Sequence, residues 1–313
     1  MSQEIHGEGR WIVGTDGSSQ SSQAIRWAAK HASERVGETR LLILHAIAPL
    51  NLQAHIGGTS MMLDGGLEYM RVARAEAERF VEQAADAIRA EYPDLVVETA
   101  VVEGHPAQVL TEVAGVADQI VVGARGRGTP ALAKMLGGVA SHVVSNAKGT
   151  VVVIPDQAEE RPDAPVVVGV DDSPQGSLAI SRAFQAASLR RVPLIALAAW
   201  DFSPYDVASS EVWHLDAEEM DRAMAVEAAE LIADERNAHP GVPVTVKAVR
   251  GRPEAALVEA SKQASLLVVG SKGRGGFASL LLGSTSRHVL REAFCPVVIT
   301  RASAGWKDRS GRE

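Results

Sequence analysis

The chain has 313 residues, 46% hydrophobic and 22% charged, which suits a globular protein with about two domains. A net charge of −8 and only 4% aromatic residues argue against nucleic acid as a partner. The single cysteine, Cys295, excludes an intrachain disulfide and a cysteine-based zinc site, and we expect it to be buried. A polar Met1–Arg10 segment and the lack of any apolar run near ~18 residues predict a cytoplasmic protein with no membrane partner.

The predicted elements alternate between strand and helix, and the whole series occurs twice. The first strand of each copy is apolar, ends at Asp16 or Asp171, and precedes Ser18 or Ser173, which can cap the next helix. Further strands are expected at 41–44, 96–104, 120–122 and 150–154, and again at 194–197, 244–251, 266–269 and 296–300. Long helices are expected at about 66–91 and 216–238, and shorter ones begin at Pro106 and Pro253.

This alternation predicts the fold class. Strands that alternate with helices form parallel βαβ units, so we expect an α/β protein of two tandem doubly wound, flavodoxin-like (Rossmann-like) domains with five-stranded parallel sheets. The expected limits are 1–157 for the first domain, 158–164 for a polar linker, 165–302 for the second domain and 303–313 for a polar tail. Residues 1–157 are called the first half below, and residues 165–302 the second half.

A glycine segment follows the fourth strand of the second half. Gly270 and Gly273 are followed, after nine residues, by Gly283 at the start of a predicted helix. Glycines let the backbone approach a ribose or phosphate closely, and a helix N-terminus offers N–H groups and a favourable dipole. Other candidate phosphate ligands are Ser284, Thr285, Ser286, Lys272 and Arg274. Turn and cap chemistry is the alternative reading, and the duplication of the pattern weighs against it.

The strand ends and the glycine segments should meet in the folded chain. In a doubly wound sheet, ligands bind beyond the carboxyl ends of the strands at the switch point. If the first and fourth strands are neighbours, as we expect in a flavodoxin-like order, Asp171 lies beside Gly270–Ser284 and Asp16 beside Gly123–Gly138. A carboxylate repels phosphate, so Asp171 is expected to accept hydrogen bonds from an adenine amino group or a ribose. Capping of a helix is the alternative role for both aspartates.

These residues, in this order, resemble the universal stress protein family, over about residues 10–301, as a tandem of two such domains. The family's ATP-binding pattern, Gly-x2-Gly-x9-Gly-Ser/Thr, matches residues 270–284 position by position. The resemblance implies that ATP, with Mg²⁺, binds at the strand ends and glycine segments. In the second half the implied residues are Val170, Asp171, Ala199, Gly270, Lys272, Gly273, Arg274, Gly283, Ser284, Thr285 and Ser286. In the first half they are Thr15, Asp16, Ala46, Gly123, Arg125, Gly126, Arg127, Gly137, Gly138 and Val139.

The first half departs from this pattern. Ten residues rather than nine separate its second and third glycines, and residues 138–140 read Gly-Val-Ala where the second copy reads Ser-Thr-Ser. Losing two charge-assisted hydrogen bonds, at about 1.5–3 kcal/mol each, would weaken binding by roughly 100-fold or more. Backbone N–H groups, Arg125 and Arg127 remain, so the sequence leaves nucleotide binding by the first half open.

Three histidines and two long loops lie near the expected crevices. His142 and His288 occupy equivalent places in the helix after each glycine segment, and without a nearby nucleophile or carboxylate we expect them to pack rather than to catalyse. His45 could line the crevice by backbone contact, with packing again preferred. The loops at Asn51–Gly66 and Asp201–Leu215 follow the second strands and could act as lids or as partner surfaces.

The resemblance implies a cytoplasmic ATP-binding regulator or sensor of the stress response, with no catalytic residue and no metal ligand from the protein. It also implies that the halves pair through their fifth strands, since such apolar edges are a hazard when unpaired. A homodimer and an unidentified protein partner are further candidates. The alternatives are a nucleotide-free interaction scaffold and a nucleotide-α-hydrolase-like adenylyl transferase, although residues 16–20 and 171–175 do not match the latter's Ser-Gly-Gly-x-Asp-Ser motif. Slow ATP hydrolysis stays open.

Overall fold

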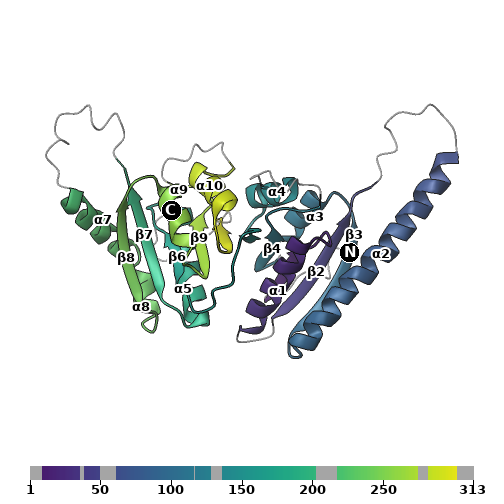
Figure 1. Cartoon of the computed structure of the whole chain (residues 1–313), viewed down its shortest axis with the longest axis horizontal. Coiled ribbons are helices and arrows are strands. Elements are labelled where there is room, and N and C mark those ends of the chain that lie inside the picture. The colour runs from purple at the N-terminus through teal and green to yellow at the C-terminus, as the bar shows by residue number, and fades with distance from the viewer. Residues whose placement is uncertain are drawn as a thin grey trace. The chain divides into compact units, whose positions relative to one another are not determined.

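The computed structural model describes residues 9–35, 39–49, 61–115, 117–127, 136–201, 217–273 and 281–301. By their contacts these fall into two compact units, Met1–Ala147 and Lys148–Glu313, called here the N-terminal and C-terminal units. Each unit is a sheet whose mostly parallel strands alternate with helices, so the predicted α/β fold class is confirmed (Figure 1). The domain limits at 157 and 165 stay a prediction. The expected tail at 303–313 lies outside the described residues.

The N-terminal unit has four parallel strands in the order β3-β2-β1-β4. Its elements are β1 (Arg10–Gly14), α1 (Ser19–Ser33), β2 (Arg40–Ile47), α2 (Met61–Glu91), β3 (Val96–Glu103), α3 (Pro106–Val113), β4 (Gln119–Gly123) and α4 (Gly138–Asn146). Gly14 of β1 lies opposite Leu44 of β2, and Val13 lies opposite Val121 of β4. The ends of β1 and β4 are therefore adjacent, which the sequence analysis required.

The C-terminal unit repeats this order as β8-β7-β6-β9 and adds two strands, β10 and β5. Its elements are β5 (Thr150–Ile154), β6 (Val166–Gly169), α5 (Pro174–Arg190), β7 (Leu194–Trp200), α7 (Ala217–Leu231), α8 (Ala233–Ala238), β8 (Val244–Arg250), α9 (Pro253–Ser261), β9 (Leu266–Gly270), α10 (Ser284–Glu292) and β10 (Val297–Thr300). The strand order is β5-β10-β9-β6-β7-β8. All of these pairs are parallel except β5 with β10, which are antiparallel, with Val152 opposite Val298.

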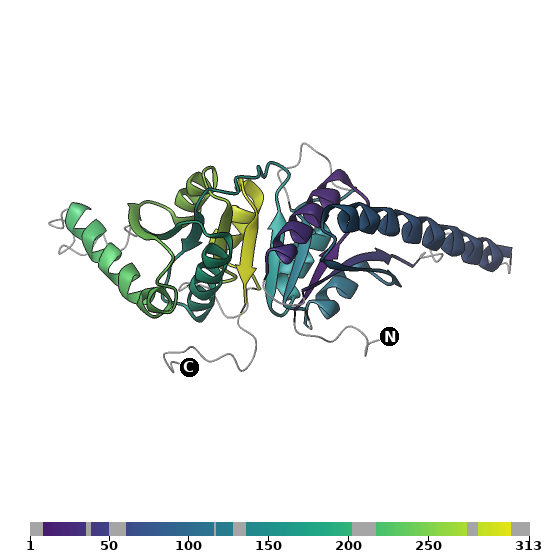
Figure 2. The same ribbon diagram turned by 90° about the horizontal axis from the view of Figure 1, so that it is seen from below.

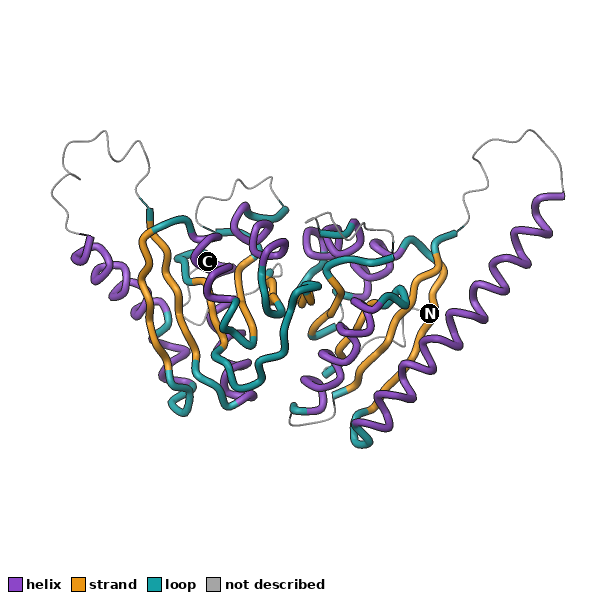
Figure 3. Tube along the Cα trace, viewed as in Figure 1, coloured by secondary structure: helices purple, strands orange, loops and turns teal. Residues whose placement is uncertain are grey.

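The order 3-2-1-4 is that of a Rossmann half, in which the first strand neighbours the fourth. A 2-1-3-4-5 flavodoxin order would instead place the first strand beside the third. The expected adjacency is therefore correct, although the order that produces it is the Rossmann one. Helices cover both faces of each sheet: α1 and α2 contact one face of the N-terminal unit while α3 and α4 contact each other on the opposite side (Figure 2). Figure 3 shows the strands side by side between these helices.

Local chemistry explains where the helices begin. The Ser18 hydroxyl accepts a hydrogen bond from the Ser21 N–H (3.1 Å), and the Ser173 hydroxyl accepts one from the Gly176 N–H (3.0 Å). Both caps are as predicted, and each is worth about 1 kcal/mol of helix stability. A proline opens α3 and α9, where its missing N–H leaves no helical hydrogen bond unmade.

Two helices differ from expectation. Helix α2 begins at Met61 rather than near residue 66, so part of the first predicted loop is helical. The segment expected as one helix at 216–238 is two helices, α7 and α8, which meet at Ile232, where the backbone has φ of −95° and ψ of −3°. Residues 51–60 and 202–216, which hold most of the proposed lids, lie outside the described residues.

The core of each unit is the sheet itself. Ile12, Val13, Val166 and Val168 are fully buried, as expected for strands covered on both faces. Cys295 is also buried, and burial raises the pKa of its thiol to about 12. Its expected packing role is therefore confirmed. Among the described helices, none combines the length and the apolar character needed to cross a bilayer.

Candidate functional site

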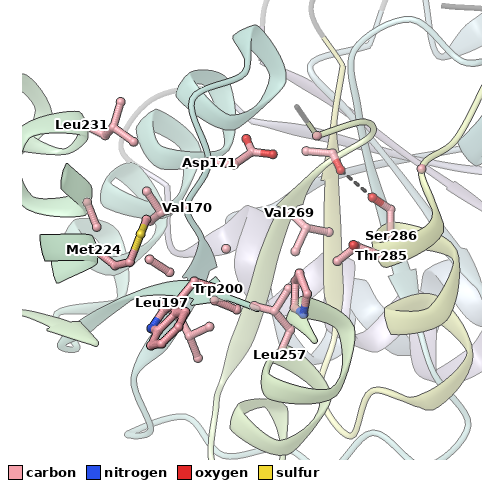
Figure 4. Close-up of a pocket in the computed structure, with 18 of the residues that line it drawn as sticks. Val170, Asp171, Leu197, Trp200, Met224, Leu231, Leu257, Val269, Thr285 and Ser286 are labelled. Carbon is pink, nitrogen blue, oxygen red and sulfur yellow. Dashed lines mark hydrogen bonds between the residues drawn. The ribbon is translucent and has the colours of Figure 1, made fainter. Parts of the chain in front are cut away.

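A cavity of about 760 Å³ opens beyond the carboxyl ends of β6, β7 and β9 in the C-terminal unit. This volume falls within the range typical of small-molecule sites. Figure 4 shows Thr285 and Ser286 on one side of the cavity, Met224 and Leu231 on the opposite side, and Asp171 between them. The full lining consists of Gly169, Val170, Asp171, Leu197, Ala198, Ala199, Trp200, Asp201, Met224, Glu227, Ala228, Leu231, Pro253, Leu257, Val269, Gly270, Lys272, Gly273, Gly283, Ser284, Thr285 and Ser286.

Asp171 stands where β6 ends and the chain turns into α5. The Ser173 hydroxyl, which caps α5, donates to the Asp171 Oδ1 atom at 2.6 Å. Asp171 is half-buried, and its Oδ2 atom faces Gly273 of the glycine segment. The carboxylate therefore lies in the wall between the end of β6 and the loop after β9, as its sequence position predicted.

Gly273 is required by this close approach. A Cβ atom at Gly273 would lie 2.5 Å from Asp171 Oδ2, so any side chain at this position would force the carboxylate to move. The same relation holds in the N-terminal unit, where a Cβ atom at Gly126 would collide with the Asp16 carboxylate. In both copies the second glycine of the motif thus lets the loop pass directly over the aspartate.

Helix α10 brings its N-terminus to the glycine segment. The Gly283 N–H donates to the Ser271 carbonyl (2.8 Å), and the buried Ser286 hydroxyl donates to the Gly270 carbonyl (2.6 Å). Ser286 lines the cavity, but its hydroxyl proton holds the loop to the helix. The N–H groups of the first helical turn have no acceptor within the helix, so Ser284 and Thr285 supply backbone donors there together with their hydroxyls.

The side of the cavity formed by β7 and α7 carries an apolar wall. Leu197 and Trp200 of β7, Met224 and Leu231 of α7 and Leu257 of α9 form this wall. The Trp200 indole N–H donates to Asp221 Oδ1 of α7 at 2.6 Å, which fixes the strand to the helix. This wall favours contact with apolar ligand atoms, whereas the N-terminus of α10 favours negative charge.

Charged side chains are divided between the two ends. Lys272 lies in the glycine segment, beside the N-terminus of α10. Glu227 and Asp201 line the cavity from α7 and from the end of β7. Negative charge on a ligand is therefore favoured near Lys272 and disfavoured near the two acidic residues.

All of the site residues predicted for the second half line this cavity except Arg274, which lies outside the described residues. In the first half, Thr15, Asp16, Gly123, Arg125, Gly126 and Arg127 come together at the ends of β1 and β4. Ala46 lies near the end of β2, and Gly137, Gly138 and Val139 begin α4. The Gly137 N–H donates to the Ala124 carbonyl (2.8 Å), which matches the bond made by Gly283.

Asp16 is held by the loop that it faces. Its Oδ1 atom accepts from the Ser18 N–H (3.0 Å) and its Oδ2 atom from the Arg127 N–H (2.8 Å). Burial acts to raise the pKa of Asp16, but the hydrogen bonds from Ser18, Arg127 and Ser21 outweigh it and set the pKa below its usual value. The Arg127 guanidinium also donates to the Gly17 carbonyl (3.1 Å).

The rings of His45 and Phe80 lie beside the turn that follows β1. His45 Nδ1 is 2.8 Å from the Thr15 carbonyl oxygen, and because a carbonyl only accepts, Nδ1 carries the proton. The His45 ring meets Phe80 of α2 edge to face, with centroids 5.0 Å apart. His45 lies within β2 and both packs and makes a backbone contact, the two roles that the sequence left open.

The sequence model of the Universal stress protein family matches the chain twice, at residues 9–155 and 164–301. The chain belongs to the universal stress protein family. A universal stress protein of Mycolicibacterium smegmatis is 36% identical over 298 residues, which cover 93% of this chain and 96% of the relative. A universal stress protein of Mycobacterium tuberculosis is 36% identical over 302 residues, which cover 93% of this chain and 97% of the relative. A solved universal stress protein from Archaeoglobus fulgidus shares the fold, with a TM-score of 0.65 at 22% identity over 94% of this chain and 96% of that one.

Sequence reasoning missed the apolar wall of this universal stress protein's cavity. Trp200 follows the predicted strand at 194–197, and Met224, Glu227 and Leu231 repeat at helical spacing on α7. The spacing marks one face of a helix but does not say that this face reaches beyond the strand ends. His142 is exposed, so the expectation that it packs is wrong, because the buried face of α4 is formed by Ala140, Val143 and Val144.

Metal ligands supplied by the protein were not expected. Among the described residues, no three His, Cys, Asp or Glu side chains cluster to hold a metal ion.

Proposed function

We propose that the C-terminal unit binds ATP with Mg²⁺ and that the nucleotide regulates the protein as a sensor of the stress response. The observation that carries this proposal is the meeting of Asp171, Gly273 and the N-terminus of α10 around one cavity that has an apolar wall on its far side. The matching glycine pattern at 270–284 within a member of the family supports it.

The chemistry of the two ends sets the orientation of the nucleotide. The triphosphate lies at Ser284, Thr285 and Lys272, where the helix N-terminus and the ammonium group favour negative charge. The adenine lies against the apolar wall near Trp200 and Met224. Asp171, between the two, accepts hydrogen bonds from the adenine amino group or the ribose.

The nucleotide is proposed to act as a ligand rather than a substrate. The described lining of the cavity contains no histidine and no cysteine, and the hydroxyl of Ser286 is engaged with a backbone carbonyl. ATP can shift the protein between conformations only through a difference in affinity for them. The competing function is a nucleotide-free interaction scaffold. The titration described below would favour it if folded wild-type protein bound no ATP.

The proposed partners rest on the pairing of strands and on the family resemblance. The antiparallel ladder between β5 and β10 supports pairing of the two repeats through their fifth strands. From the family resemblance we also propose that the protein forms a homodimer, has a further protein partner and is located in the cytoplasm.

The experiment that tests ATP binding is calorimetric titration of nucleotide-stripped protein with ATP and Mg²⁺, on wild type and on Gly283→Glu. The Gly283 backbone is extended, with φ of −69°, and a Cβ atom there would have ordinary contacts, the nearest being 3.4 Å away. The fold should therefore tolerate the change. A carboxylate beside the phosphates should weaken binding by at least about 100-fold.

A matched control is Gly241→Glu, which makes the same change of charge in the same unit. A Cβ atom at Gly241 would meet nothing within 4 Å, and this position precedes β8 at the other end of the strands. It should bind ATP like wild type. Wild-type affinity in Gly283→Glu would refute the site assignment, and no binding by folded wild type would favour the scaffold.

A further inference from the structure

The segment that enters α10 is held by two arginines. The Arg301 guanidinium donates to the Leu281 carbonyl at 2.7 Å. The Arg287 guanidinium donates to the next carbonyl, that of Leu282, at 3.3 Å. Gly283, which follows, is tied to the glycine segment by its own N–H. Arg287 and Arg301 are called the clamp here, because they fix the two residues that precede the first residue of the helix N-terminus.

The two members of the clamp come from different elements. Arg287 belongs to α10 and donates to a carbonyl five residues before it. Arg301 follows β10, whose last residue, Thr300, is fully buried. The Thr300 hydroxyl donates to the Gln175 carbonyl at the start of α5 (3.1 Å), and the Thr300 carbonyl accepts the N–H of Ser271 (2.8 Å). Arg301 is therefore attached at a point that is fixed both to the glycine segment and to α5.

The first half of the chain has no counterpart of the clamp. Helices α4 and α10 both have nine residues, and each begins after a glycine and ends before an alanine. The strands that follow, β5 and β10, end at matching distances from these helices, so the two copies align without a gap. In this alignment Arg287 corresponds to Ser141 and Arg301 to Pro155, and neither of these carries a cation. The clamp and the intact glycine motif therefore occur in the same half.

The clamp adds positive charge where the helix already favours anions. The free N–H groups of the first helical turn and the helix dipole attract phosphate to the N-terminus of α10. Lys272 of the glycine segment lies beside it. Arg301 is half-buried, and burial lowers the pKa of its guanidinium because the charged form loses hydration. A phosphate group near the helix N-terminus would offset that cost.

The position of the clamp bears on the length of a bound phosphate chain. Asp171, the proposed contact for the adenine amino group or the ribose, follows β6, whereas the clamp lies at the start of α10. The phosphate of a nucleoside monophosphate stays next to the ribose, but the second and third phosphates of a triphosphate can extend to the helix N-terminus. Each further phosphate also brings more negative charge toward Lys272 and the clamp.

We infer that the clamp holds the N-terminus of α10 in the position that binds a polyphosphate chain, and that it makes the site prefer nucleoside triphosphates to nucleoside monophosphates. This inference rests on the proposed function, because it assumes that the cavity binds a nucleotide. Arg287 and Arg301 do not line the cavity, so they act through the backbone of the segment before α10 as positioning residues. ATP rather than AMP would then set the state of the proposed sensor.

The nucleotide preference of the wild-type protein is the first test. Calorimetric titration of the nucleotide-stripped full chain with ATP and with AMP, both with Mg²⁺, should give an affinity at least about tenfold higher for ATP, the effect of one additional charge-assisted hydrogen bond. Equal affinities would overturn the inference and leave the proposed function standing. No binding of ATP, or ATP binding that Gly283→Glu leaves unchanged, would overturn the proposed function and the inference with it.

Removal of the clamp is the second test. Arg301→Ala should weaken ATP binding by at least about tenfold and leave AMP binding within about twofold of wild type, because only the distal phosphates lose a well-placed helix N-terminus. Arg301→Lys keeps a cation that can donate to the Leu281 carbonyl, and it should recover most of the loss. Unchanged ATP affinity in Arg301→Ala, or an equal loss for ATP and AMP, would overturn the inference.

Two further variants guard against a loss of folding. Arg287→Ala breaks the clamp on a different element, and it should shift the preference in the same direction. Arg236→Ala is the matched control, because Arg236 is exposed on α8, which precedes β8 at the other end of the strands, and it should bind both nucleotides like wild type. Each variant must keep a cooperative thermal unfolding transition. Folded Arg287→Ala and Arg301→Ala proteins that both retain the wild-type ratio of ATP to AMP affinity would refute the role of the clamp.

Discussion

Asp16 and Asp171 occupy the same place in the two halves of the chain, and each carboxylate lies against the second glycine of the segment after the fourth strand. Asp16 receives two backbone N–H groups, from Ser18 and Arg127, while Asp171 accepts the hydroxyl of its capping serine and lines the cavity. At the scale of single residues, Asp16 therefore braces the loop that follows β4.

The hydrogen bonds to Asp16 predict a dependence of stability on pH. The pKa of Asp16 is lower in the folded protein than in the unfolded chain, so its ionised form stabilises the fold above the unfolded pKa of about 3.9. That contribution is lost as the pH falls through the lower, folded pKa. Asp16→Asn should lower the free energy of unfolding at pH 7 and should lower it less at pH 3.

Urea unfolding of wild type and Asp16→Asn at the two pH values measures this change. Asp172→Asn is a suitable control, because Asp172 is exposed in the corresponding turn of the second repeat. Its stability should match wild type at pH 7. A destabilisation by Asp16→Asn that is the same at both pH values would show that the charge of Asp16 is not what stabilises the turn.

At the scale of elements, α10 and β9 are joined by the hydroxyl of Ser286. This bond to the Gly270 carbonyl fixes the helix N-terminus against the glycine segment, and the first repeat lacks it because Ala140 takes the same place in α4. The serine that the motif suggests as a phosphate ligand is thus a structural tie. Ser284 and Thr285 also line the cavity and are the proposed phosphate ligands among these hydroxyl residues.

Two single substitutions in α10 should separate these roles. Ser286→Ala removes a buried hydrogen bond and leaves the Gly270 carbonyl without its donor, so it should lower the free energy of unfolding by about 1–3 kcal/mol. Ser284→Ala, at an exposed position two residues earlier, should leave stability within about 0.5 kcal/mol and weaken ATP binding severalfold. Urea unfolding and calorimetry measure the two effects. An equal loss of stability in both variants would contradict the assignment.

The elements themselves were predictable where one signal dominates. Short apolar runs bounded by glycine gave the strands, and Ser18, Ser173, Pro106 and Pro253 gave the helix starts. The break at Ile232 was not predictable, because the apolar spacing continues through it. The wall residues Trp200 and Met224 were missed for a related reason: which face of a helix reaches a cavity depends on how it packs against the sheet, and not on its own periodicity.

At the scale of the whole molecule, residues distant in sequence share one ladder. Strand β5 comes from the first copy of the repeat, yet by its contacts it belongs to the C-terminal unit, where Val152 lies opposite Val298. Cys295 is buried close to this ladder, two residues before β10 begins. The chain's single thiol therefore reports on whether β10 remains in place.

Val152→Lys tests this coupling. A charge at a fully buried strand position should destabilise the C-terminal unit by at least about 3 kcal/mol. Labelling of Cys295 by a thiol reagent at pH 8, slow in the native protein because the thiol is buried and has a raised pKa, should become at least about tenfold faster. Val96→Lys, on an exposed position of β3, should label like wild type. Equal labelling of all three proteins would exclude the coupling.

The ladder between β5 and β10 also sets an order of events during synthesis. Its paired residues are about 146 positions apart, so β5 leaves the ribosome long before its partner exists. At about 5–20 residues per second, the delay is roughly 7 to 30 s. During that time the apolar β5 edge that will face β10 has no partner strand, and such an edge can pair with a neighbouring chain. The newborn protein is therefore most prone to aggregate in the interval between its two repeats, before the last strand arrives.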